Sequence, residues 1–74
     1  MSNDAVTRLR TFVQTQPARE LLSVETLAAG LGIPRFQVRE ILATYRVKEA
    51  WLAADAFIAR DILKALPEDS TINQ

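Results

Sequence analysis

The chain has 74 residues, a formal net charge of zero, and neither cysteine nor histidine. This length limits it to one domain, and a chain so short buries only about 60% of the surface that its unfolded form exposes. Disulfides and thiolate or imidazole metal sites are excluded, so oligomerisation is the expected source of added stability. No apolar run reaches the roughly 18 residues that cross a bilayer, and the polar N-terminus is unlike a signal peptide. We therefore expect a complete, soluble, cytoplasmic protein that does not engage a membrane.

The charges are unevenly distributed along the chain. Residues 1–48 carry seven basic and four acidic side chains, whereas residues 49–74 carry two basic and five acidic ones. Such asymmetry favours a basic working end and an acidic end that avoids nucleic acid. A difference of this size also arises by chance, so it supports a function only together with a motif.

Residues 4–14 form the first periodic segment. Its apolar residues recur at helical spacing and would lie on one face: Ala5, Val6, Leu9, Phe12 and Val13. Pro17 ends this helix, because the residue before a proline avoids the α region. We expect a second, short helix over residues 18–22.

A helix that starts at Ser23 and ends just before Leu31 follows. Ser23 is a good N-cap, and Glu25 favours the positive end of the helix. The only two glycines, Gly30 and Gly32, lie at the other end, where a positive φ costs glycine little.

The next helix is predicted over residues 34–45. Its buried face is expected to comprise Val38, Ile41, Leu42 and Tyr45. A last, long helix is predicted over residues 49–66, where Pro67 stops it. The polar tail, residues 67–74, is expected to be flexible.

Together, residues 23–45 resemble the helix-turn-helix of small phage, plasmid and bacterial transcriptional regulators. The resemblance rests on Ala28, on Gly32 and Ile33 four and five residues later, and on Val38 and Ile41. A small side chain at position 28 lets the two helices cross closely. The resemblance implies that helix 34–45 is a recognition helix, whose N-terminal half faces base edges in the major groove.

The side chains away from the buried face are candidates for contacts with DNA bases. An arginine pairs with guanine, a glutamine pairs with adenine, and an apolar ring can touch a thymine methyl group. The candidates are Arg35, Phe36, Gln37, Arg39 and Glu40. For Phe36 the alternative is packing against a partner subunit or a neighbouring helix.

Other polar groups suit contacts with DNA phosphates. Cationic side chains and free N–H groups at a helix N-terminus both bind phosphate oxygens. The candidates are Ser23, Thr26, Arg46, Lys48, Arg8 and Arg10. The alternative for each basic residue is a solvated surface charge, and the low overall basicity departs from the usual DNA-binding domain.

The last predicted helix has a wide apolar face, from which we predict a dimer interface. Phe57 stands outside that face and has no evident place in a monomer core, which suggests a partner. The predicted interface comprises Trp51, Asp55, Phe57, Ile58 and Ile62. Asp55 would either reach water or a surface arginine, or pair with an arginine across a two-fold axis.

The sequence therefore predicts an all-α fold with four to five short helices, a central helix-turn-helix and a long C-terminal helix. Residues 1–66 would be one domain. No wing is expected, because "TYRVKEAWLAADAF" has no glycine and no alternation.

The predicted function is sequence-specific binding of double-stranded DNA by a homodimeric repressor that needs no cofactor. Its activity would be regulated by its own concentration or by a partner protein. Catalysis is not expected, because no nucleophile, phosphate loop or acid–base pair stands out. The alternatives are a protein-interaction module, such as an adaptor, inhibitor or antitoxin-like protein, and an architectural or recombination-accessory DNA binder.

Overall fold

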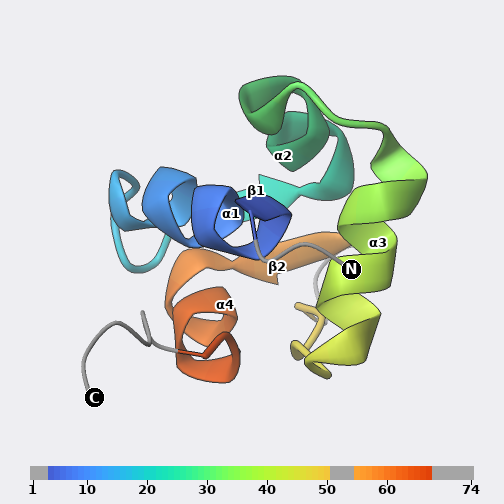
Figure 1. Cartoon of the computed structure of the whole chain (residues 1–74). Coiled ribbons are helices and arrows are strands. Elements are labelled where there is room, and N and C mark those ends of the chain that lie inside the picture. Colours follow the sequence, from blue (N-terminus) through green and yellow to red (C-terminus); the bar gives the residue numbers. More distant parts are fainter. Residues whose placement is uncertain (1–3, 51–54, 68–74) are drawn as a thin grey trace, which may run out of the picture.

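The computed structural model describes residues 4–50 and 55–67 (Figure 1). Within them the elements follow the order α1 (Asp4–Gln14), β1 (Leu21–Ser23), α2 (Val24–Leu31), α3 (Arg35–Thr44), β2 (Ala56–Ile58) and α4 (Ala59–Ala65). None of the helices in this part of the chain is long and apolar enough to cross a membrane.

Helices α1, α2 and α3 confirm the first, third and fourth predicted segments. The Ser23 hydroxyl caps α2 by accepting a hydrogen bond from the Thr26 N–H, at 3.0 Å. At the other end Gly32 adopts a left-handed conformation with φ 69°. The N–H groups of Gly32 and Ile33 both donate to the Ala28 carbonyl, which is the bonding pattern of a glycine-terminated helix.

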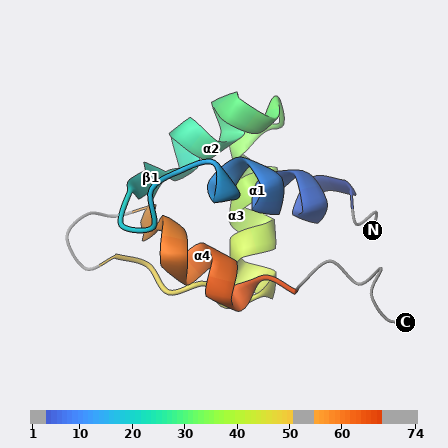
Figure 2. The same cartoon turned by 90° about the vertical axis from the view of Figure 1, so that its left-hand side faces the viewer.

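The four helices of the described residues share one hydrophobic core. Helix α1 lies between α2 and α4 (Figures 1 and 2). Helix α2 also packs against α3, and Ala28 on α2 is buried. The largest fully buried side chains come from every helix: Leu9, Val13, Val24, Leu27, Val38, Ile41 and Ile62.

The structure corrects the expectation that the chain forms no strands. Residues 17–19 make a turn, and Leu21–Ser23 is strand β1 instead of the end of a short helix. This strand pairs antiparallel with β2, placing Leu21 opposite Ile58 and Ser23 opposite Ala56. Each strand has only three residues, which is too short for a period-two pattern to stand out in the sequence.

The long helix predicted over residues 49–66 is also wrong, because only Ala59–Ala65 is helical in the described part of this segment. Glu49 instead forms an antiparallel bridge with Phe57, and the Ala50 N–H donates to the Ala56 carbonyl at 2.7 Å. Residues 49–50 and 56–58 are therefore the two arms of a hairpin. Residues 45–48 connect α3 to this hairpin. The expectation of an all-α fold without a wing is therefore wrong as well.

Burial of Phe57 explains why residues 56–58 form a strand, although the alanines of this part of the chain favour a helix. The Phe57 side chain is only 8% exposed and belongs to the main core, so the ring has a place within the monomer after all. Residue Leu22, opposite it in the ladder, is also buried. Tertiary burial of this kind outweighs intrinsic helix propensity, which differs by less than about 1 kcal/mol per residue.

We predict that Gly30→Ala destabilises the domain, although alanine in place of a helical glycine usually adds about 1 kcal/mol of stability. A Cβ atom at position 30 would lie 2.6 Å from the Phe12 Cε1 atom, so the ring must move. The measurement is a double-mutant cycle of chemical unfolding with Phe12→Ala. In the Phe12→Ala background, Gly30→Ala should become stabilising. Equal effects in both backgrounds would contradict the contact.

Candidate nucleic-acid interface

The outward face of α3 carries most of the residues predicted to contact bases. The helix is fixed from behind by Val38, Ile41 and Leu42, each no more than 3% exposed. Phe36 is 68% exposed. The structure also exposes Arg35, Arg39 and Glu40, while Gln37 is half-buried. Four of the five predicted base-contacting side chains are thus accessible on one helix.

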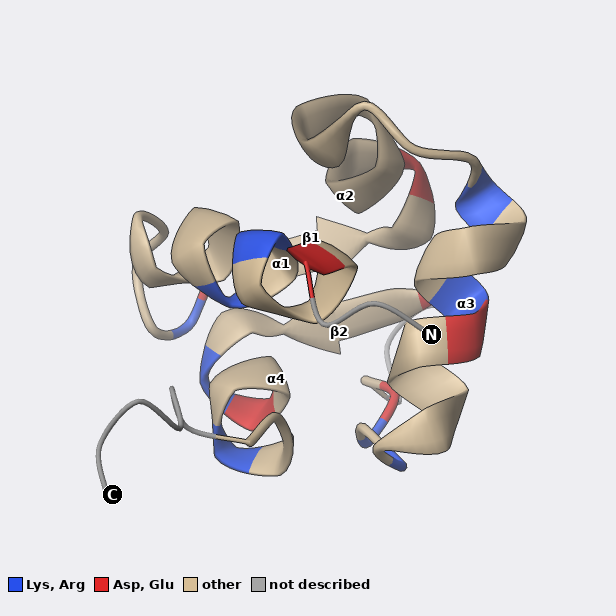
Figure 3. Ribbon diagram, in the orientation of Figure 1, with Lys and Arg blue, Asp and Glu red and all other residues tan. Residues whose placement is uncertain are grey.

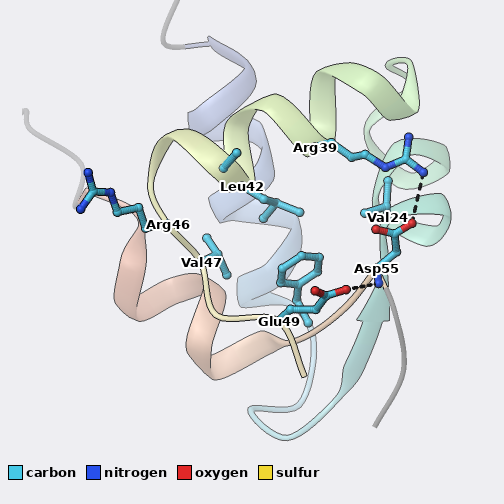
Figure 4. Close-up of a pocket in the computed structure, with 9 residues that line it drawn as sticks. Val24, Arg39, Leu42, Arg46, Val47, Glu49 and Asp55 are labelled. Atoms are coloured by element: carbon cyan, nitrogen blue, oxygen red, sulfur yellow. Dashed lines mark hydrogen bonds and ion pairs between the residues drawn. The ribbon is translucent and has the colours of Figure 1, made fainter. Parts of the chain in front are cut away.

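A groove of about 250 Å³ separates α3 from the hairpin (Figure 4). Its lining includes four apolar side chains, Val24, Leu42, Val47 and Phe57. Four charged residues from both sides also line it: Arg39, Arg46, Glu49 and Asp55. The groove therefore combines an apolar surface with two positive and two negative charges.

Arg39 and Asp55 form an ion pair across this groove, with Arg39 Nη2 at 3.2 Å from Asp55 Oδ2. Their side chains are 51% and 53% exposed, and exposed pairs of this kind add only about 0–1 kcal/mol to stability. Asp55 thus reaches a surface arginine of its own chain, as one of the two sequence-based alternatives proposed.

Two hydrogen bonds hold the backbone of Asp55. Its N–H donates to the Glu49 carboxylate, and its carbonyl accepts a hydrogen bond from the Val24 N–H at 2.9 Å. Asp55 also has a φ of 59°, a left-handed conformation in which aspartate is enriched over most non-glycine residues. The start of α2, the hairpin and α3 consequently meet at this one residue.

Residues predicted to bind phosphate occupy two different regions. Arg46 and Lys48 are exposed just after α3, and Ser23 and Thr26 stand at the N-terminus of α2, with the Ser23 hydroxyl donating to Thr26 Oγ1 at 2.9 Å. Figure 3 shows basic positions on α3 and beyond its end, with acidic positions among them. Of these four residues, Arg46 lines the groove, and Ser23 directly precedes Val24, which also lines it.

Arg8 and Arg10 lie on α1 and already have partners within the chain. The Arg8 guanidinium donates to the carbonyl of Leu31, the last residue of α2, and Arg10 Nη1 donates to the Pro67 carbonyl at 3.4 Å. A cation beside a helix C-terminus stabilises its unpaired carbonyls. Their role as phosphate contacts stays a prediction.

The residues predicted for the dimer interface are not gathered on one free surface. Phe57 and Ile62 are buried in the monomer core, Ile58 is half-buried, and Asp55 is exposed beside the groove. Trp51 lies outside the described residues. Only Leu21 and Phe36 are large exposed apolar side chains in the part of the chain that the structure describes.

Sequence reasoning missed the groove because it missed the hairpin. The predicted helix over residues 49–66 gives no indication that Glu49 and Asp55 lie near Arg39. The available signal was weak: Asp55 is a residue type that tolerates positive φ, and it lies two residues before the apolar pair Phe57 and Ile58. No glycine or proline marks a turn between residues 49 and 58.

Comparison with protein-family models, curated proteins and solved structures finds no significant match to this chain. The features that bear on function are therefore the arrangement of α2 and α3 and the groove beside α3.

We predict that Arg8→Gln lowers the free energy of unfolding by about 1 kcal/mol, the usual worth of a hydrogen bond at a helix end. The exposed Arg19, in the turn before β1, provides the matched control. Thermal melts of Arg8→Gln and Arg19→Gln compare the loss of one positive charge with and without the contact to Leu31. Equal melting temperatures for the two variants would show that the contact to α2 adds nothing.

Proposed function

We propose that this protein binds double-stranded DNA sequence-specifically and acts as a transcriptional regulator, most simply a repressor. The observation that carries the proposal is the accessible face of α3, where Arg35, Phe36 and Arg39 project while Val38 and Ile41 anchor the helix. Helix α3 follows α2 through a tight turn at Gly32, as a recognition helix does. In the proposal, the N-terminal half of α3 meets base edges.

The hairpin beside α3 strengthens this proposal in one respect. A recognition helix in the major groove brings the flanking backbone of DNA close to the elements on either side of it. Arg46 and Lys48 lead from α3 into the hairpin, and both are exposed. In the proposal they contact phosphates next to the bases that α3 reads.

A protein-interaction module is the second candidate, and a specific observation favours it. Phe36 is the most exposed large apolar side chain of the described residues, and aromatic side chains are enriched at protein interfaces. The zero net charge also supplies less attraction to DNA than a basic domain would. An architectural or recombination-accessory DNA binder is the third candidate.

A salt titration distinguishes these candidates. Binding to selected and random duplexes would be measured at several salt concentrations, because phosphate contacts make affinity depend on salt. Tight binding to the selected duplex supports the regulator. A salt-dependent affinity without sequence preference favours the architectural protein, and failure to bind either duplex favours the interaction module.

For the regulator, Arg35→Ala should reduce discrimination between the selected and random duplexes by about 1–3 kcal/mol, the value of one bidentate base contact. The matched control is Arg60→Ala on α4, which removes another exposed arginine away from α3. Folding should survive in both variants, since neither side chain is buried. Unchanged discrimination in Arg35→Ala would contradict its role in base recognition.

The proposal includes two copies on one DNA site, because each neutral domain offers few phosphate contacts. The free protein should nevertheless be a folded monomer at low micromolar concentration, since Phe57 and Ile62 are buried within one chain. Sedimentation equilibrium with and without a selected duplex measures both states. A dimer that forms without DNA at low micromolar concentration would contradict this prediction and restore the case for an interface near the last helix.

A further inference from the structure

The ion pair between Arg39 and Asp55 bears on how the protein would recognise DNA. This inference rests on the proposed function. Arg39 stands on the exposed face of α3, yet its Nη2 atom is held 3.2 Å from the Asp55 carboxylate. An arginine has five N–H donors in a fixed planar arrangement. With one donor occupied and the side chain 51% exposed, the remaining donors stay accessible in a restricted orientation.

Asp55 is suited to orienting another residue because both its backbone N–H and its carbonyl are hydrogen-bonded. Its N–H is bonded to the Glu49 carboxylate and its carbonyl to the Val24 N–H. Its φ of 59° is one that glycine adopts without strain, and the chain has an aspartate there. A non-glycine residue in such a conformation, held by its surroundings, is a feature that concentrates at functional sites.

We propose that Asp55 is a specificity-determining positioning residue, which orients Arg39 toward a guanine edge and withholds it from phosphates. Two effects act together. The carboxylate fixes the direction of the guanidinium, which favours the bidentate contact with guanine O6 and N7. It also neutralises the arginine charge, which weakens contacts with phosphates of any sequence. Asp55 therefore lowers affinity for random DNA and preserves the preference for one base pair.

The testing variant is Asp55→Asn, because asparagine also tolerates the left-handed conformation and retains the size of the side chain. Removing the carboxylate charge frees Arg39 for one more phosphate contact. On a random-sequence duplex, the plot of log affinity against log salt concentration should become steeper by about 0.9. At 0.1 M salt that change corresponds to a gain of roughly five- to tenfold in affinity.

The ratio of affinities for the selected and random duplexes should fall by at least the same factor, and the preference for guanine at one position should be lost. Glu20→Gln is the matched control, because it removes one negative charge from an exposed residue at the opposite end of β1. This control should leave the salt slope and the ratio nearly unchanged.

A second background shows whether Asp55 acts through Arg39. In Arg39→Ala protein, Asp55→Asn should change neither the salt slope nor the affinity ratio. An equal gain in both backgrounds would mean that Asp55 simply repels phosphates, and would overturn the positioning role. The inference is also overturned if wild-type protein prefers its selected duplex and Asp55→Asn binds both duplexes as wild type does. Failure of wild-type protein to bind any duplex would instead refute the proposed function, and the inference with it.

Discussion

The short pairing of β1 with β2 is the interaction on which the arrangement of this domain depends. It joins residues 21–23 to residues 56–58, which places the hairpin beside the start of α2 and delivers Phe57 to the core. The same pairing returns the chain so that α4 follows at once and packs on α1. Without it, Asp55 would not meet α2, and the groove next to α3 would lose one wall.

Much of the helical part could be predicted because its signals are local. Ser23 as a cap, Gly32 as a left-handed terminator and the spacing of Val38, Ile41 and Leu42 each depend on residues within about two turns. Those signals were sufficient to place α2 and α3, and with them the exposed face that carries Arg35 and Arg39. The helical spacing of Leu9, Phe12 and Val13 placed α1 in the same way. A long-range ladder between three-residue strands leaves no comparable local trace.

The hairpin could not be predicted for a second physical reason. The segment from residue 47 to residue 58 is rich in alanine, which has the highest helix propensity of all residues, and its only positive-φ residue among those described is an aspartate. Propensity and tertiary burial therefore oppose each other there, and burial of Phe57 prevails. The pairing of Asp55 with Arg39 follows from that result and from no pattern in either local sequence.

The balance of charge around α3 gives the candidate interface a different character from a strongly basic one. Arg39 and Arg46 share the groove with Glu49 and Asp55, so under the proposed function the attraction to the DNA backbone would be partly cancelled at close range. A surface of this kind would gain little from non-specific attraction to DNA, and under the proposed function its affinity would come from well-oriented short contacts. Orientation of individual side chains then matters more than their number.

Helix α4 has only seven residues and no side-chain cap at its start. Its first two N–H groups, those of Ala59 and Arg60, donate instead to the carbonyls of Glu20 and Ala18, each at 2.9 Å. The turn before β1 therefore supplies the N-terminal cap of α4. A tag, cleavage site or inserted loop is usually placed in an exposed turn because such turns tolerate change, but here an insertion at residues 18–20 would uncap a helix from the other end of the domain.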